Sequence, residues 1–161
     1  MSRKIDPKVK IIMNQAINEA KDHDDNKIKP EHVLLSMVLD NDNECTWALT
    51  LMDIDTFTLY DKISDFTRKN DLNPRTDYNS RKSLPFSDEM KLIIKNLDKH
   101  CDKLKDDIID TTHLMLSILD SKLPLVVMLS EINITYNKFL KTVTNMDKFE
   151  HKNSAFSSED G

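Results

Sequence analysis

The residues of this chain best suited to chemistry lie in two short segments that each end in a histidine. Glu31 precedes His32 in the first segment, and Thr112 precedes His113 in the second. Both segments lead into apolar runs, so they are typical of the first turn of a buried helix, where a histidine caps or packs. That position favours a structural role for both histidines. Glu31 is explained equally well by the positive end of a helix dipole and by contact with a ligand.

Other spacings do not favour catalysis, metal binding or a cofactor. The only glycine is Gly161, so a Gly-x-x-x-x-Gly-Lys-Ser/Thr phosphate loop, and with it ATP hydrolysis, is excluded. The acidic run Asp40–Glu44 lacks the glycine and the final acid of a calcium loop, and Asp22–Asp25 has no suitably spaced partner for a metal. No Ser-His-Asp or Cys-His pattern has a supporting context. We therefore expect no enzyme, no metal and no cofactor.

Glycine scarcity favours helices, and we expect a cytoplasmic protein, or an organellar one if a transit peptide was removed. The formal net charge is -5, from 23 basic and 28 acidic residues, and this disfavours nucleic acid and membrane surfaces as partners. The N-terminus becomes polar before any long apolar stretch, so we expect no signal peptide and no membrane span. Cys45 is expected at a loop edge and Cys101 in a helix core, both as free thiols.

Apolar periodicity predicts an all-α fold with eight helices and no strands. The first helix should run from Pro7 to Asp22, and the second should open at Pro30 and end at Asp40. Two shorter amphipathic helices should follow by residue 67. The stripe of the first helix consists of Val9, Ile12, Met13, Ala16, Ile17 and Ala20.

The same pattern recurs later in the chain, which indicates an internal repeat. Residues 68–85 are polar and carry turn signals, so they are predicted to be a linker. A shift of 81 residues, and later of 80, then places apolar residues on apolar residues. We expect two pseudo-twofold four-helix repeats, about 5–67 and 86–146, in one domain over 1–146, with a disordered tail over 147–161. The matches include Ile5 with Phe86, Ile12 with Ile93, His32 with His113, Leu35 with Leu116 and Ser36 with Ser117.

The segment Ile28-Lys29-Pro30-Glu31-His32-Val33-Leu34-Leu35, with Ala20 eleven residues before Glu31, resembles the helix start of the Clp N-terminal domain, or Clp repeat. In Clp-type unfoldases this paired four-helix repeat precedes the ATPase rings. The similarity covers about residues 5 to 143, and its second copy departs from the pattern at Thr112, where the family often has Glu. It implies a free-standing domain, without the ATPase modules, that recruits substrates or adaptors to a Clp machine.

That resemblance implies an accessory or adaptor protein whose partner is a Clp ATPase or protease component, an adaptor or a client. Two alternatives remain open. A phage or mobile-element product could act as a decoy or inhibitor of the Clp system, and a structural oligomerisation protein could have no Clp partner at all.

Family members related to ClpC bind phosphorylated arginine through a Thr near the start of each repeat and the Glu of each Glu-His pair. The resemblance pairs Asp6 with Glu31 in the first repeat and Ser87 with Thr112 in the second. Asp6 would repel a phosphate, and Thr112 lacks the carboxylate that pairs with a guanidinium, so we expect no intact phosphoarginine pocket. The predicted protein- or peptide-binding residues are Asp6, Glu31, His32, Ser87, Thr112 and His113.

The two helix starts also differ in charge, since Lys29 of the first repeat corresponds to Asp110 of the second. Such divergence is expected if the two faces meet different parts of one partner, or if only one face still binds. Neutral drift of surface residues explains it equally well.

Overall fold

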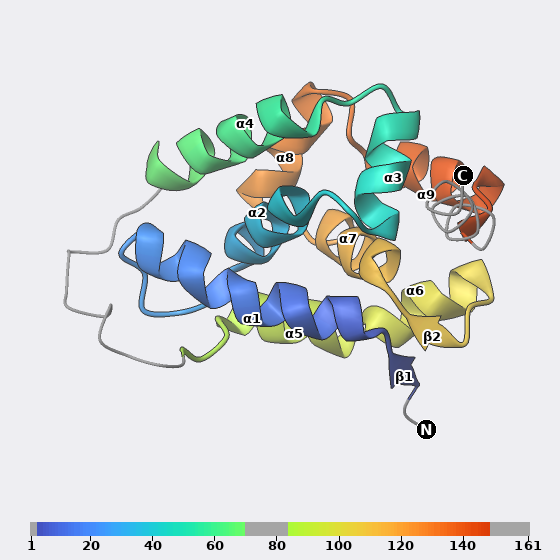
Figure 1. Cartoon of the computed structure of the whole chain (residues 1–161), viewed down its shortest axis with the longest axis horizontal. Coiled ribbons are helices and arrows are strands. Elements are labelled where there is room, and N and C mark those ends of the chain that lie inside the picture. The colour runs from blue at the N-terminus through green and yellow to red at the C-terminus, as the bar shows by residue number, and fades with distance from the viewer. Residues whose placement is uncertain (1–2, 70–83, 149–161) are drawn as a thin grey trace, which may run out of the picture.

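The computed structural model describes residues 3–69 and 84–148, in which helices dominate (Figure 1). The first repeat contains β1 (Lys4–Ile5), α1 (Pro7–Asp22), α2 (Pro30–Asp40), α3 (Glu44–Leu51) and α4 (Thr56–Lys69). The second contains α5 (Asp88–Lys95), α6 (Leu97–Leu104), β2 (Ile108–Ile109), α7 (Thr111–Leu119), α8 (Pro124–Glu131) and α9 (Tyr136–Asn145). The predicted all-α architecture of two four-helix repeats is confirmed.

The first helix of the second repeat is divided by a single residue, so the eight predicted helical units appear as nine labelled helices in the described residues. Asn96 lies between α5 and α6 with φ -93° and ψ 5°, and its N–H still reaches the carbonyls of Leu92 and Ile93. At Asn96 the backbone leaves α-helical geometry for one residue, while its hydrogen bonds to the preceding turn are kept. Helices α5 and α6 together therefore correspond to α1.

Local sequence explains where the helices begin and end. Pro7 and Pro30 occupy the first turns of α1 and α2, where a missing N–H costs nothing. The Asp6 carboxylate accepts the Lys8 N–H at 2.9 Å and caps α1, while Asn41 ends α2 in the left-handed conformation with φ 55°. Helix α4 continues to Lys69, so Arg68 and Lys69 of the predicted linker are helical, and its residues 70–83 lie outside the described part of the chain.

The prediction of no strands was wrong. Strands β1 and β2 form a parallel pair in which Lys4 faces Ile108 and Ile5 faces Ile109, and a matching isolated bridge joins Ile28 to Phe86. Two-residue strands are too short to show a period of two in the sequence, which is why the pattern gave no sign of them.

The two strand contacts are equivalent under the 81-residue shift, and each joins one repeat to the other. The Asp6 N–H donates to the Ile109 carbonyl and the Ser87 N–H to the Ile28 carbonyl, both at 2.9 Å. The first residues of each repeat therefore lie beside the start of the second helix of the other repeat. Figure 1 shows β1 leaving α1 to reach β2 of the other repeat.

The core is shared between the repeats around the central helices α2 and α7. Leu35 and Leu116 are fully buried at equivalent positions, and α3 of the first repeat packs on α7 and α9 of the second. Buried serines fasten each second helix to the first: the Ser36 hydroxyl donates to the Ile12 carbonyl and Ser117 to Ile93. These matched bonds confirm the predicted repeat register at Ser36 with Ser117 and at Ile12 with Ile93.

Both cysteines are free and buried. Cys45 lies in the first turn of α3, inside the helix and not at a loop edge, whereas Cys101 lies in α6 as expected. Burial raises the pKa of the Cys45 thiol above its ordinary range and that of Cys101 to about 11. Neither thiol is a reactive nucleophile in this state, because the thiolate is the reactive form.

No single helix within residues 3–69 and 84–148 combines the length and the apolar composition needed to cross a membrane. Helices α7 and α8 meet those criteria only as a pair, across a bend of 101°.

Candidate functional site

His32 belongs to a buried polar cluster at the start of α2. Its side chain is fully buried; Nδ1 accepts the Lys29 N–H at 2.9 Å, and Nε2 lies 2.7 Å from Oδ2 of Asp25. Because Nδ1 accepts a backbone hydrogen bond, Nε2 is the ring nitrogen that carries a proton, and it faces the carboxylate. This arrangement joins the loop after α1 to the first turn of α2, and it leaves no ring nitrogen for a ligand.

His113 repeats the arrangement at the start of α7. Its Nδ1 accepts the Asp110 N–H at 2.9 Å, its Nε2 lies 2.8 Å from Oδ2 of Asp106, and its ring is fully buried. Asp25 and Asp106 correspond under the 81-residue shift. Both histidines therefore have the structural role that their first-turn positions favoured, and their burial argues against the predicted direct contact with a peptide.

The charges around the two histidines differ. In the first repeat the Lys29 ammonium lies 3.0 Å from Oδ1 of Asp25. In the second repeat Asp110 takes the place of Lys29, and the cation is supplied by Lys148, which lies 2.8 Å from Asp106 and 2.9 Å from Asp110. Lys148, the second residue of the predicted disordered tail, is thus held by two carboxylates, while residues 149–161 lie outside the described part of the chain.

The structure brings the predicted site residues together across the repeats, whereas the prediction paired them within each repeat, because the first residues of each repeat pair with the segment before the second helix of the other. Ser87 lies against the helix start that carries Glu31, through its hydrogen bond to Ile28, and Asp6 lies against the helix start that carries Thr112. The sequence alignment of the two repeats shows which residues are equivalent. It cannot show that the first residues of one repeat contact the second helix of the other.

Of the six predicted binding residues, Asp6 and Glu31 are partly exposed, while Ser87 and Thr112 are buried together with the two histidines. The Ser87 hydroxyl accepts the Met90 N–H at 3.2 Å and caps α5. The Thr112 hydroxyl donates to the Asp110 carboxylate. Binding through Asp6 and Glu31 stays a prediction.

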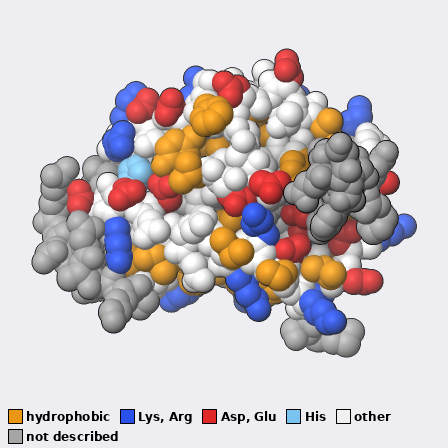
Figure 2. Space-filling view, in the orientation of Figure 1, with side chains coloured by type: hydrophobic (Ala, Val, Ile, Leu, Met, Phe, Trp, Pro, Cys, Tyr) orange, Lys and Arg blue, Asp and Glu red, His pale blue; other side chains and the backbone are white. Residues whose placement is uncertain are grey.

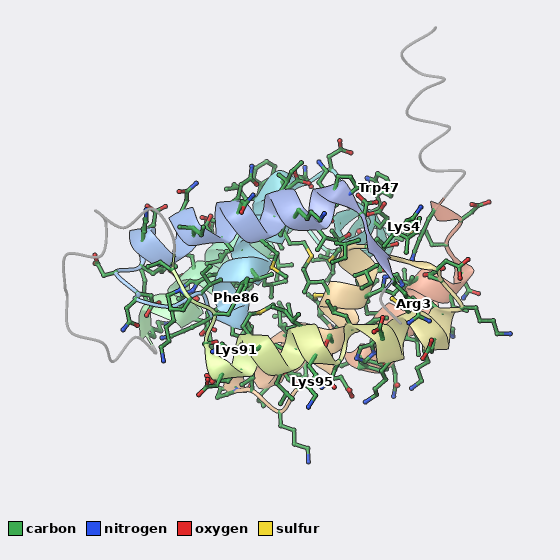
Figure 3. The ribbon with its side chains drawn as sticks, turned by 90° about the horizontal axis from the view of Figure 1, so that it is seen from below. Arg3, Lys4, Trp47, Phe86, Lys91 and Lys95 are labelled. Atoms are coloured by element: carbon green, nitrogen blue, oxygen red, sulfur yellow. The ribbon has the colours of Figure 1, made fainter. Side chains whose placement is uncertain are left out.

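Glu31 lies at the rim of a groove between the repeats, with a volume of about 300 Å³. The groove combines two carboxylates, one lysine and an apolar lining from α4 and the start of α8. Its lining residues are Lys29, Pro30, Glu31 and Phe66 from the first repeat, and Glu89, Leu123, Pro124 and Leu125 from the second. Figure 3 shows Phe86 between α2 and the start of α5, where the two repeats meet.

Sequence analysis missed most of these groove residues. Of the lining residues, only Glu31 was among the predicted binding residues. Their common surface arises because Phe86 pairs with Ile28, which brings α5 beside α2. The one signal available was the exchange of Glu31 for Thr112 between otherwise equivalent helix starts.

One group of described residues has the composition of a metal site. Asp106, Asp110 and His113 each place one potential ligand atom within 4.8 Å of the others. Both carboxylates already bond the Lys148 ammonium, which supplies the positive charge that the cluster requires. The arrangement is therefore explained without a metal ion.

These features define a tandem-repeat helical domain whose polar helix starts lie at the seams between the repeats. The family model of the Clp repeat (R) N-terminal domain matches residues 4–132, most of the sequence, and the chain belongs to this family. Among curated protein sequences, none matches this chain.

Solved structures with similar folds include the N-terminal domain of Hsp104 from Candida albicans, with a TM-score of 0.69 and 14% identity over 89% of this chain and 91% of that one. The N-terminal domain of the chaperone ClpD from Arabidopsis thaliana gives a TM-score of 0.63 and 11% identity, over 87% and 92%. A ClpV N-domain in complex with a VipB peptide gives 0.62 and 12%, over 86% and 88%. At these identities the likeness shows the shared fold.

Proposed function

We propose that this chain is a non-catalytic protein-binding module that acts as an accessory or adaptor of a Clp chaperone or protease. It binds a Clp component, an adaptor or a client segment in the groove between the repeats. The observation that carries this proposal is the composition of that groove, in which the carboxylates of Glu31 and Glu89 border an apolar lining contributed by both repeats.

Such a groove suits an extended peptide that presents a basic side chain next to an apolar one. Glu31 and Glu89 both lie in first turns of helices, so both side chains project from fixed backbone positions. A guanidinium or ammonium can bond either carboxylate, and charged hydrogen bonds contribute about 1.5–3 kcal/mol each. Phe66 and Leu125 supply apolar surface for the neighbouring side chain.

Two further observations support a binding role over a catalytic one. The family relatives with this fold are N-terminal domains of Clp-type proteins, and one of them is described in complex with a peptide. The histidines of this chain, the natural candidates for acid–base chemistry, are both buried and engaged by backbone and carboxylate groups.

Reversing the charge of Glu31 should test the proposal. Glu31→Lys places a cation in a groove expected to receive one, so we expect retention of a Clp component, adaptor or client in a pull-down to fall about tenfold or more. Circular dichroism should show an unchanged helical fold, because Glu31 is partly exposed. The matched control is Glu131→Lys at the exposed end of α8, outside the groove, which should bind as the unmodified protein does.

Equal binding by the Glu31→Lys and Glu131→Lys proteins would contradict the proposed groove. The same pull-down, combined with an assay of the degradation of a model Clp substrate, separates the alternatives. A decoy would retain the same component and lower the degradation of a model Clp substrate. A purely structural subunit would retain only copies of itself.

A further inference from the structure

The outer faces of α1 and α5 carry lysines in a stretch that has no acidic residue. Residues 7–18 of α1, and residues 90–97 of α5 and the start of α6, contain no Asp or Glu, although the chain has 28 of them. Lys10, Lys91 and Lys95 are exposed there, and none of the three forms an ion pair with another described residue. This face is therefore locally basic, whereas the formal net charge of the chain is -5.

The acidic residues near this face do not neutralise it. Asp98 and Asp102 on α6 bond the guanidinium of Arg3. Asp88 and Glu89 lie in the first turn of α5, at one end of the face. An acidic group from another molecule would therefore meet ammonium groups that have no counter-charge of their own.

Two large apolar side chains lie among these lysines. Ile11 on α1 is 45% exposed, and Leu92 on α5 is 58% exposed. The two positions are equivalent under the 81-residue shift, and each follows an exposed lysine, Lys10 or Lys91. The exposed position of Leu39, by contrast, carries an aspartate in the second repeat. The pair of a lysine and an aliphatic residue thus occurs at the surface of both repeats, where it contributes little to the core.

The two pairs lie on the same side of the molecule, because α1 and α5 run side by side along its underside (Figure 1, Figure 3). Figure 3 views this side and shows Lys91 and Lys95 on α5. Figure 2 shows basic and apolar side chains next to one another along the lower edge of the molecule. The surface formed by Lys10, Ile11, Lys91, Leu92 and Lys95 is called the lysine face below.

We propose that the lysine face is a docking surface for an acidic amphipathic segment of a partner protein. Aliphatic side chains of that segment contact Ile11 and Leu92, and its carboxylates lie against the three lysines. The apolar contact removes exposed hydrocarbon from water, and the opposite charges raise the rate and the selectivity of association. The lysine face shares no residue with the groove at Glu31, so it is a second surface, beyond the one in the proposed function.

Nucleic acid fits this face less well than protein does. Neither α1 nor α5 contains an aromatic residue on which a base could stack. A phosphate backbone would satisfy the lysines but would leave Ile11 and Leu92 exposed to water. A second copy of this chain, bound through the same face, would place lysines against lysines, which is unfavourable.

The test measures binding to the full chain of a fluorescent peptide made of two copies of Glu-Leu-Leu-Glu-Glu-Leu-Leu, by fluorescence anisotropy. One control peptide has Ser in place of every Leu, and another has Lys in place of every Glu. Both should bind at least about tenfold more weakly, because the first lacks aliphatic side chains and the second lacks carboxylates. Added salt should weaken binding, since it screens exposed charges. The probe has no basic residue, so it does not report on the groove at Glu31.

Lys91→Glu combined with Lys95→Glu should weaken binding of the probe at least about tenfold, and Leu92→Ser should weaken it as well. Because Lys95 lies in the last turn of α5, where an acid disfavours the helix, Lys91→Gln combined with Lys95→Gln is measured too and should also weaken binding. The matched control is Lys138→Glu combined with Lys141→Glu, at two exposed positions of α9. It changes the net charge equally and should bind as the unmodified chain does.

Equal weakening by the control variant on α9 would overturn the proposal, because the probe would then sense only the total charge. Absence of probe binding, or equal binding of the peptide that has Ser in place of Leu, would overturn it too. Tighter binding of a single-stranded DNA oligonucleotide than of the probe would assign the face to nucleic acid instead. Sedimentation that shows oligomers of the unmodified chain and monomers of the Lys91→Glu, Lys95→Glu variant would assign it to a second copy.

Discussion

Leu35→Ala and Leu116→Ala should each lower the free energy of unfolding by about 2–5 kcal/mol. Both side chains are fully buried at equivalent positions of α2 and α7, where the two repeats share one core. Removing either leaves a cavity that rigid helices on several sides cannot fill. The measurement is chemical denaturation followed by circular dichroism.

Leu39→Ala is the matched control, because Leu39 lies on the same helix as Leu35 and is 63% exposed. Its effect should stay within about 0.5 kcal/mol. A Leu35→Ala protein as stable as the Leu39→Ala protein would show that α2 is not the central helix of a shared core.

His32→Ala should cost about 3–5 kcal/mol, since it removes a buried partner of a buried carboxylate. Asp25 is 1% exposed, so water cannot take the place of the imidazole, and Lys29 reaches only the other carboxylate oxygen. His113→Ala should cost less, because Asp106 is 32% exposed and bonds the Lys148 ammonium through the same oxygen that His113 contacts. Denaturation of both variants under the same conditions gives the comparison.

The ranking of these two histidine variants is the informative result. Equal losses of unfolding free energy in the two variants would mean that Lys148 compensates for the lost imidazole no better than Lys29 does. A larger cost for His113→Ala would contradict the assignment of Lys148 as the compensating cation.

Sequence periodicity predicted the helices and their register because those features are local. Pro7 and Pro30 set helix starts through their own backbone, and Ser36 and Ser117 make equivalent bonds because equivalent helices pack in the same way. The histidines could be interpreted structurally from their first-turn positions alone.

The interlocking of the repeats was not predictable in the same way. It depends on strands of only two residues and on two equivalent backbone contacts, each of which joins one repeat to the other. The groove at Glu31 and the cluster at Asp110 are both consequences of contacts between distant segments. The replacement of Lys29 by Asp110 was visible in the sequence, but only the position of Lys148 explains how that change is tolerated.

The central claim, that the groove between the repeats binds a Clp partner or client, is tested most directly by site-specific photo-crosslinking in native cell extract. Phe66→p-benzoylphenylalanine places the reactive ring in the groove, and Phe57→p-benzoylphenylalanine places it on the same helix at a position that is 78% exposed and outside the groove. The account predicts that the Phe66 variant crosslinks to a protein identified by mass spectrometry as a Clp ATPase, protease subunit, adaptor or client, and that the Phe57 variant does not. Crosslinks to such a protein from Phe57 alone, or from neither position, would contradict it.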